Sequence, residues 1–550
     1  MQSNNFTEYD RYLSPIDVLA IAFGCTVGWS AFVLPGTMFL PLGGPVGTLA
    51  SMAISAAIML IIGANFSYLM TNRPGTGGMY AYTKEAFGRE HAFFCAWFLS
   101  LAYLTILFIN ATSLFSVIRL IFSRRLQIGF YSYQIGGNVI FLGEVAASFV
   151  VLAGIGLLFI NAKPFLQQVQ TKLAIVLLLG VLLLAAISLP TSIEKFAGSG
   201  AFGISGESRP SNLFSLVMLT PGLFVGFEVI SLETAHFDFQ MRKTKWIAMG
   251  SILLCAVIYL ALTIIGMRTA PDGYASWQAY IADLGNLDGF ASVPTFYSAK
   301  GIMGDAGILI MALAAFAAIL TSIIAGYRAT TRMLATMAED NIISEHLSNT
   351  NYSIVAIMVV CIAISFFGSH MLEDFTELTF LGAVICFGYT SASAWKLAKE
   401  KGNWMYVITG VIGIVVSVMF AIVKLVPWLP SVNPMGANAF LLLTVWCLLG
   451  FMFHLRTLAR SSAGVYSGSS LSGIMMFALL LFSVLMWLGK RLLEAESIEM
   501  VKSILRYEGG LMLIVIFIGL GIMLYIQKLT QKKHEELLKE TVLHFKDDGE

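Results

Sequence analysis

Apolar runs of about 20 residues recur along almost the whole chain and are separated by short polar joints. Hydrophobic residues make up 57% of the 550 residues, and the mean hydropathy is +0.81. Charged residues account for only 12%, roughly half the share of an ordinary soluble domain. Since a helix needs roughly 20 apolar residues to cross a bilayer, the sequence predicts an integral membrane protein with many spans.

The apolar runs predict 14 spans. They lie near residues 15–40, 44–71, 91–121, 139–162, 165–189, 211–237, 245–268, 305–336, 351–369, 376–397, 404–423, 437–455, 470–490 and 509–528. We expect an all-α fold, because lipid offers the backbone no hydrogen bonds and only helices or closed barrels cross it. Runs this long exclude the barrel, whose strands alternate over about 10 residues.

These spans divide the chain into four predicted parts. They are a cytosolic N-terminal segment (1–14), a ten-span core (15–400), four additional spans (401–528) and a charged cytosolic tail (529–550). With the amino terminus in the cytoplasm, the inner joints hold most of the 33 Lys and Arg residues, as the positive-inside rule requires. The exceptions are three arginines predicted to lie on the outer side, Arg119, Arg124 and Arg125. We expect a plasma-membrane protein with both termini in the cytoplasm.

Charge and cysteine content exclude several classes of protein. The formal net charge of +1 provides no basic excess for nucleic acid. All six cysteines lie in apolar runs, where a free thiol behaves as a small hydrophobic group. No histidines show metal-ligand spacing, and no nucleophile and base converge. We therefore expect no metal, no cofactor and no enzyme. The longest outer segment, residues 269–304, is interpreted either as a lid or as a plain connection.

Two spans contain residues that interrupt a helix. The first reads FGCTVGWSAFVLPG and the sixth reads LTPGLFVGFE. Glycine loosens a helix and proline removes a hydrogen bond, so both sequences favour local unwinding. The alternative is that these residues only allow close contacts between membrane helices. Because the breaks head spans one and six, they divide ten spans into two sets of five, the pattern of an inverted repeat.

Unwinding at the middle of the membrane exposes backbone N–H and C=O groups, which is tolerated where they line a cavity or bind something. A zwitterion meets this demand. Its carboxylate takes the N–H groups at the start of a half-helix, aided by the helix dipole, and its ammonium takes the freed carbonyls. The sequence thus predicts a site for a small amino-acid-like solute.

The first break, with the later segment NRPGTGGMYAYTKEAFG, resembles the amino acid–polyamine–organocation (APC) permeases. The segments FVGFEVISLE and GYRATTRMLATMAEDNII are similar to the corresponding family segments, so the resemblance covers about residues 14–400. It implies a five-plus-five inverted-repeat fold, with discontinuous first and sixth helices that hold the substrate between them. It also implies transport by alternating access.

Carried over by position, the resemblance implies that Trp29 and Ser30 offer N–H groups to the carboxylate. The carbonyls of Thr26, Gly222 and Val225 would face the ammonium. The complete implied substrate site is Thr26, Val27, Gly28, Trp29, Ser30, Asn110, Gly222, Phe224, Val225 and Gly226. For Asn110 the alternative is a hydrogen bond between helices. The chain departs from the family at Ser30, where glycine is usual, at Gly222, where an aromatic gate is usual, and at Ala235–His236, which replaces an acidic pair.

Two ionisable residues are candidates for coupling. Lys172, in VQTKL, resembles the lysine whose ammonium replaces a sodium ion between the first and eighth spans of sodium-independent relatives. Thr321 and Ser322 would receive it. The alternative is that Lys172 reaches the water at the inner face. Glu228 is a carboxylate at membrane depth, and thus a candidate proton carrier or a partner for a cationic substrate.

Together these features predict a sodium-independent amino-acid permease that works by proton symport or by exchange, with lipid and protons as its other partners. Two alternatives stay open. One is a transporter of polyamines or other organic amines with the same fold, in which Glu228 meets a cation. The other is a nutrient sensor that binds its ligand without transport and signals through the charged tail.

Overall fold

The computed structural model describes residues 11–75, 77–122, 131–135, 138–196, 204, 210–426, 434–460 and 471–547. Most of the predicted N-terminal segment, Arg124, Arg125 and the last three residues lie outside this set.

The described residues form an all-α membrane fold. Twelve of their helical segments are long and apolar enough to cross a bilayer, and two shorter apolar helices accompany them, α1 (Pro15–Thr26) and α14 (Thr350–Ser365). The other main helices are α3 (Leu40–Asn72), α5 (Arg89–Phe122), α6 (Leu142–Asn161), α7 (Lys163–Phe196), α10 (Thr244–Gly266), α13 (Asp305–Glu339), α15 (Leu372–Glu400), α16 (Trp404–Leu425), α17 (Ala437–Arg460), α18 (Leu471–Leu493) and α20 (Gly509–Asp547). Helices thus occupy every predicted apolar run.

One predicted span begins too early. Residues 139–141 belong to strand β2 (Asn138–Phe141), which pairs antiparallel with β1 (Ser132–Ile135). The helix α6 starts only at Leu142. The run Val139-Ile140-Phe141 is apolar but consists of β-branched and aromatic residues, which favour a strand. Hydropathy alone does not separate such a strand from the first turn of a helix.

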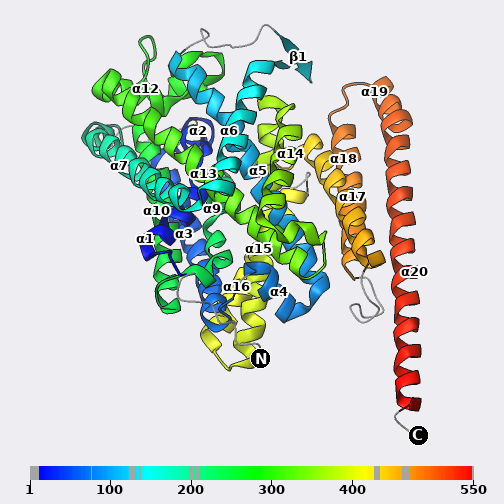
Figure 1. The fold of residues 1–550 in the computed structure, drawn as a ribbon. Coiled ribbons are helices and arrows are strands. Elements are labelled where there is room, and N and C mark those ends of the chain that lie inside the picture. The colour runs from blue at the N-terminus through cyan, green and yellow to red at the C-terminus, as the bar shows by residue number, and fades with distance from the viewer. Residues whose placement is uncertain are drawn as a thin grey trace.

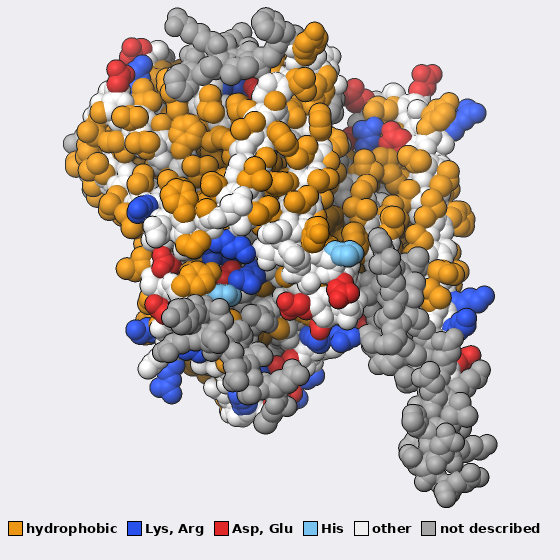
Figure 2. Space-filling view, in the orientation of Figure 1, with side chains coloured by type: hydrophobic (Ala, Val, Ile, Leu, Met, Phe, Trp, Pro, Cys, Tyr) orange, Lys and Arg blue, Asp and Glu red, His pale blue; other side chains and the backbone are white. Residues whose placement is uncertain are grey.

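The surface is divided into a hydrophobic zone and charged zones, as in a membrane protein. Figure 2 shows a broad hydrophobic zone, with charged side chains gathered below it and a few above it. Large apolar side chains lie open on this zone, among them Leu179 (61% exposed), Val415 (61%) and Phe517 (67%). A contiguous apolar surface of this extent is not found on soluble monomers, and lipid is the solvent that suits it.

The helices α13 and α15 occupy the centre of the bundle. The helix α13 packs against α5 and α7, and α15 packs against α5 and α16. The helices α17, α18 and α20 pack against one another and stand to one side of this bundle (Figure 1). The described chain ends at Asp547, at the lower end of the molecule in Figure 1, which we call the inner end after the predicted orientation.

The opposite, outer end is covered by the folded segment between α10 and α13. This segment contains α11 (Trp277–Ala282) and α12 (Pro294–Met303). The Thr295 hydroxyl donates a hydrogen bond to the Phe32 carbonyl at 2.9 Å. The segment predicted as a lid or a connection is therefore attached directly to the first broken helix.

Candidate substrate site at two broken helices

The first break lies at Val27 to Trp29. The helix α1 ends at Thr26, and Val27 is extended (φ −97°, ψ 101°). The helix α2 (Ser30–Leu34) starts directly after Trp29 and runs into a π-helix, Pro35–Phe39. A β-branched residue followed by glycine disfavours the helix at this point, as the sequence predicted.

Asn110 of α5 fills the first break. Its Oδ1 accepts the Trp29 N–H at 3.1 Å, and its Nδ2 donates to the Ile106 carbonyl at 2.9 Å. A Cβ on Gly28 would stand only 2.6 Å from Asn110 Oδ1, so this approach requires glycine. The Trp29 N–H predicted to be free for a carboxylate is therefore already bonded. Asn110 thus lies at the first break, and it makes a hydrogen bond between helices, which was the alternative prediction for this residue.

The carbonyl end of α1 faces α13. The Ser322 hydroxyl lies 2.9 Å from the Gly24 carbonyl oxygen, 3.3 Å from that of Cys25 and 3.5 Å from that of Val27. A hydroxyl has one hydrogen and serves one of these oxygens at a time. Thr321 donates to the Ala317 carbonyl at 2.8 Å. The Thr321 side chain packs closely on Gly24, because a Cβ placed on Gly24 would lie only 2.7 Å from the Thr321 Cβ.

The second break lies at Val225 and Gly226. It follows two short helices, α8 (Pro210–Val217) and α9 (Thr220–Phe224), and precedes the 3-10 helix η4 (Phe227–Leu232). Gly226 has φ +117°, a backbone conformation that side chains rarely adopt. A Cβ on Gly226 would lie 2.9 Å from the backbone of Cys25. The second break therefore touches the last turn of α1, two residues before the first break.

Glu228 is buried beside this contact. Its side chain is 1% exposed, and its Oε2 accepts the Gly226 N–H at 2.8 Å. Tyr103 of α5 lies against the same carboxyl group. A carboxyl group so placed changes the charge at the contact between the two broken helices when it gains or loses a proton.

The remaining predicted residues surround the breaks. Phe224 is fully buried, Thr26 is 7% exposed, and Ser30 is partly buried. A Cβ on Gly222 would meet only Phe380, at 3.7 Å, so this position is open. On the outer side Trp29 stacks on Phe32, with ring centroids 6.3 Å apart, and the ring of Phe296 in α12 lies 6.2 Å from that of Trp29.

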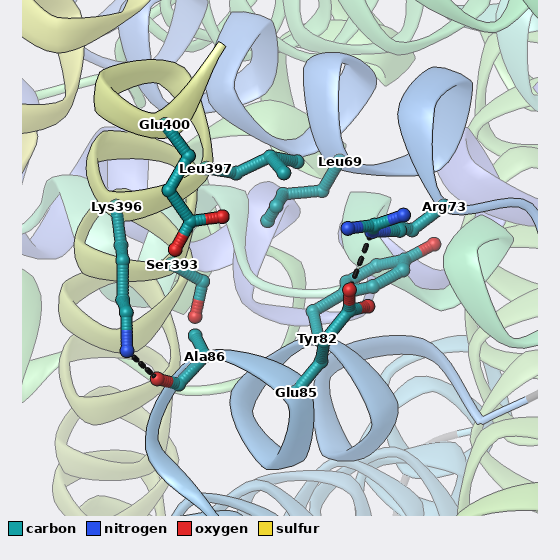
Figure 3. A pocket seen from close by; sticks show the side chains of 9 residues that line it. All are labelled: Leu69, Arg73, Tyr82, Glu85, Ala86, Ser393, Lys396, Leu397 and Glu400. Atoms are coloured by element: carbon teal, nitrogen blue, oxygen red, sulfur yellow. Dashed lines mark hydrogen bonds and ion pairs between the residues drawn. The ribbon is translucent and has the colours of Figure 1, made fainter.

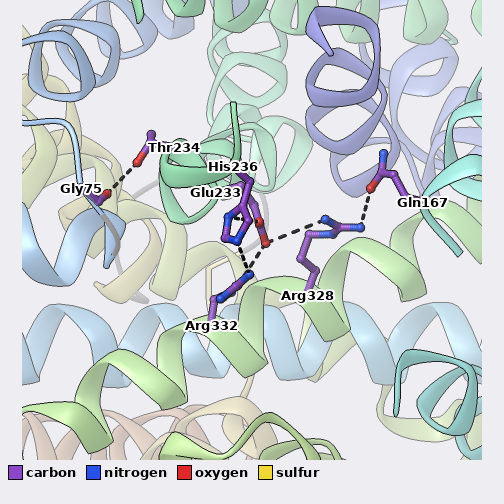
Figure 4. A network of polar contacts seen from close by, with 7 residues as sticks. All are labelled: Gly75, Gln167, Glu233, Thr234, His236, Arg328 and Arg332. Atoms are coloured by element: carbon purple, nitrogen blue, oxygen red, sulfur yellow. Dashed lines mark hydrogen bonds and ion pairs between the residues drawn. The ribbon is translucent and has the colours of Figure 1, made fainter. Parts of the chain in front are cut away.

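The inner side is covered by a charged network (Figure 4). Its centre is Glu233, 1% exposed, whose Oε1 lies 3.4 Å from Arg332 and 3.9 Å from Arg328 of α13. His236 lies 3.3 Å from the other Glu233 oxygen, and Arg328 donates to Gln167 of α7. This inner network ties the segment after the second break to two core helices.

The N-terminal end of the described chain completes this cover. The backbone N–H groups of Tyr12 and Leu13 donate to the His236 carbonyl, at 3.1 and 3.0 Å. The Asp238 N–H donates to the Leu13 carbonyl at 3.1 Å. The segment after the second break is therefore tied to the N-terminal end of the described chain as well as to α13 and α7.

Lys172 does not lie where the resemblance placed it. Its side chain is exposed, and its neighbour Thr171 faces α1 instead, donating to Asp17 Oδ1 at 2.7 Å. Successive helical residues differ by about 100° around the axis, so both cannot face α1. The expectation that a lysine ammonium lies between α1 and α13 is wrong.

The inner network also contains residues that the sequence analysis did not single out, Arg328 and Gln167. A signal existed for Arg328, because a charged residue inside an apolar span has a function or a partner by default. Gln167 has no such signal, since amides are common at helix ends.

The geometry defines a class of protein: a multi-pass membrane protein in which two interrupted helices meet inside the helical bundle. Comparison with known proteins identifies the family. The model of the amino acid permease family matches residues 13–453, and the chain belongs to this family. Members of this family are transport proteins rather than enzymes.

Two curated relatives share low identity with the chain. The branched-chain amino acid permease BcaP of Lactococcus lactis subsp. cremoris (strain MG1363) is 21% identical over 421 residues, which cover 72% of this chain and 83% of the relative. The vacuolar cationic amino acid transporter 4 of Arabidopsis thaliana is 22% identical over 402 residues, covering 68% of this chain and 62% of the relative. The chain thus spans about three fifths of this second protein.

Proposed function

We propose that the chain is a sodium-independent amino-acid permease of the plasma membrane that works by alternating access, with proton coupling or exchange. The observation that supports this most strongly is the contact of the second break, at Gly226, with Cys25 at the end of α1, with the carboxyl group of Glu228 buried beside it. The unwound backbone of Val225 and Gly226, the end of α1 and one ionisable group meet there, which suits the binding of a zwitterion at broken helices.

The solute enters this site by replacing bonds that the protein makes to itself. Its carboxylate displaces Asn110 Oδ1 from the Trp29 N–H, at the start of α2. Its ammonium binds the carbonyls at the end of α1, which Ser322 serves only in part. The Trp29 N–H and the α1 carbonyls thus keep a hydrogen-bond partner in the bound state, and the displaced Asn110 Oδ1 then accepts from the solute ammonium or from water.

Alternating access then consists of opening one cover at a time. The outer cover is the lid with Trp29, Phe32 and Phe296. The inner cover is the network around Glu233. In a proton-coupled cycle, protonation of Glu228 removes the charge that accepts the Gly226 N–H, and so loosens the contact between the broken helices.

The test is uptake into proteoliposomes. We expect labelled L-leucine or L-arginine to accumulate when a pH gradient is imposed, acid outside, without sodium. Glu228→Gln should lose the response to the pH gradient by about tenfold or more, whereas Glu339→Gln, an exposed carboxyl at the end of α13, should keep it. Uptake that ignores the pH gradient but responds to amino acid loaded inside would identify an exchanger. Uptake driven only by sodium would contradict the proposal.

A second candidate is sodium symport at the contact of α1 and α13. With Lys172 on the surface, no ammonium from α7 lies there. The observation that favours sodium is the cluster of oxygens that Ser322 shares among three carbonyls, since hard cations prefer oxygen ligands. In that case Ser322→Ala would abolish stimulation by sodium, and Glu228→Gln would retain it.

The relatives suggest which solutes to try first, because one is a branched-chain amino acid permease and the other a cationic amino acid transporter. Competition separates the remaining alternatives. Inhibition by putrescine but not by amino acids would favour an amine transporter, and saturable binding without uptake would favour a sensor.

A further inference from the structure

Gly222 stands just before the second break, and its own geometry does not require a glycine. It lies inside α9, and its φ is not positive. Outside its own helix, a Cβ built there would have one neighbour within 4 Å, the Cδ2 of Phe380 in α15, at the ordinary contact distance of 3.7 Å. Gly222 is also partly exposed, whereas Pro221 and Leu223 on either side of it are buried. The glycine therefore leaves unfilled space beside the break.

The short helix α9 runs beside both ends of the proposed solute site. The Tyr259 hydroxyl of α10 donates to the Leu223 carbonyl at 3.2 Å. The same hydroxyl lies beside the Ser30 side chain, at the start of α2. Gly226, directly after α9 and Val225, touches the end of α1. A solute held between α1 and α2 therefore has α9 as its neighbour.

The wall opposite Gly222 is apolar. It is formed by Phe380, whose side chain is 6% exposed. Phe380 belongs to a cluster of buried apolar side chains from α8, α15 and α16, which also contains Val217, Met218, Val384 and Phe420. An apolar ring beside an unfilled space favours an apolar group there, because the contact removes apolar surface from water.

An ion pair holds Phe380 from behind. The Lys424 Nζ lies 5.8 Å from the centroid of the Phe380 ring and 2.9 Å from Oε1 of Glu377, one helical turn before Phe380. The other Glu377 oxygen accepts the Gly436 N–H at 2.7 Å. Because the protein itself uses both oxygens of this carboxylate, Glu377 is not available to a cationic solute.

We propose that the space between Gly222 and Phe380 receives the side chain of the solute, and that the chain selects amino acids with a bulky, uncharged, apolar side chain. This assignment rests on the proposed function, since it takes the carboxylate and ammonium of the solute to lie at the broken helices. An alanine would leave the space unfilled. An arginine would bring its charge against Phe380, where Glu377 is already paired.

Labelled L-leucine, L-alanine and L-arginine, compared in the same proteoliposomes, test this selection. We expect kcat/KM for leucine to exceed that for alanine or arginine by about tenfold or more, because even one methylene group in an apolar pocket changes this quantity by about tenfold. The shift in Tm that each amino acid causes in the purified full-length chain is measured in parallel, since a solute stabilises the state that binds it.

Two variants change the space itself. Gly222→Leu fills it, and Phe380→Ala removes its wall. Each should lower the preference for leucine over alanine by about tenfold, in kcat/KM and in the concentration needed for the Tm shift. A ratio of two solutes does not depend on the amount of folded protein. A Gly222→Leu chain that does not fold would show that the space is absent, and would overturn the proposal.

The matched control lies on the same helix as Phe380. Leu397 of α15 is 8% exposed and lines a separate hollow at the inner end, between the end of α3, the short helix α4 (Gly78–Phe87) and the end of α15 (Figure 3). No residue that lines this hollow belongs to either break. Leu397→Ala should therefore keep the preference for leucine, although it removes buried apolar surface in the same way as Phe380→Ala.

The outcomes separate this proposal from the proposed function. Binding that prefers leucine, without uptake or exchange, would contradict transport and support the side-chain site. Uptake or binding led by alanine would overturn the side-chain site alone, and a lead by arginine would do so by assigning the side chain to Glu228. An equal loss of preference in Leu397→Ala, or none in Gly222→Leu, would also overturn it. Neither binding nor uptake of any of the three solutes would contradict both.

Discussion

Gly226 is held in place by two separate constraints. Its φ of +117° excludes side chains on conformational grounds, and the nearby backbone of Cys25 excludes them on steric grounds. Gly222, four residues earlier, is subject to neither, since it is helical and a Cβ there would lie 3.7 Å from Phe380. Gly222 in α9 and Gly226 in the second break therefore have different structural roles.

Replacing Gly226 with alanine should destabilise the protein far more than the same change at Gly222. A left-handed conformation costs a side chain about 1–2 kcal/mol, and the contact with Cys25 adds to it, so we expect a total of about 2–4 kcal/mol for Gly226→Ala. We expect less than about 1 kcal/mol for Gly222→Ala. Thermal unfolding in detergent measures both. Equal shifts in Tm would show that the second break does not touch the end of α1 as described.

At the scale of residues, the sequence predicted the interruptions but not every partner. Glycine, proline and a carboxyl at membrane depth are visible in any sequence, and they located Gly28, Gly226 and Glu228. The position of Lys172 could not be predicted, because α7 is apolar on most sides and its pattern does not fix the rotation of the helix. The bond from Trp29 to Asn110 joins residues 81 positions apart, and no local pattern indicates it.

The helix α13 connects several parts of the candidate site. Ser322 meets the end of α1, Arg328 and Arg332 meet Glu233, and the Tyr327 hydroxyl donates to the Leu152 carbonyl of α6 at 2.9 Å. At its inner end it holds α4 through Asp340. Burial alone would raise the pKa of Asp340, but hydrogen bonds from Lys84 and Tyr80 and the charges of Lys84 and Arg89 bring this pKa below its usual value. The carboxylate that binds α4 is therefore charged at neutral pH.

The two arginines of α13 form a matched pair for a test of the inner network. Arg328 is 7% exposed and Arg332 is 38% exposed, and both face the buried Glu233 carboxylate. Removing a buried partner leaves a buried charge uncompensated, so Arg328→Met should cost about 2–4 kcal/mol. Arg332→Met should cost less than about 1 kcal/mol, since water screens exposed pairs. If Arg332→Met lowered Tm more than Arg328→Met, the assigned burial would be wrong.

At the scale of elements, hydropathy found the long helices and missed the short ones. The helices α4, α11 and α12 lie in polar joints and have 10, 6 and 10 residues, too few for a membrane span. The hairpin before α6 was missed for the opposite reason, because β2 is apolar and continues into the helix. Short elements depend on tertiary contacts such as the bond from Thr295 to Phe32, which sequence periodicity does not contain.

In the molecule as a whole, the contact of Gly226 with Cys25 lies between the segment of α11 and α12 at the outer end and the network around Glu233 at the inner end. The all-α membrane character followed from composition, since no other architecture accommodates so many long apolar runs. The packing of α13 and α15 at the centre, and the separation of α17, α18 and α20, depend on side-chain fit between distant segments. Composition does not determine such fit.

The orientation of the molecule can be tested with single cysteines, because all six native cysteines are buried. We expect Asp288→Cys, on the lid, to react with a membrane-impermeant maleimide in intact cells. Glu345→Cys, between α13 and α14, should react only after the cells are permeabilised. Both positions are exposed, so access to the side of the membrane decides the result. The reverse pattern would place both termini outside the cytoplasm.

The helix α20 is longer than any bilayer requires. Its 39 residues, Gly509–Asp547, extend about 58 Å at 1.5 Å per residue, against a hydrocarbon core about 30 Å thick. Nearly half of its length therefore exceeds the thickness of that core, and Figure 1 shows α20 continuing well past the ends of α17 and α18. The helix thus carries the described chain about 28 Å beyond the length that crossing the lipid core requires.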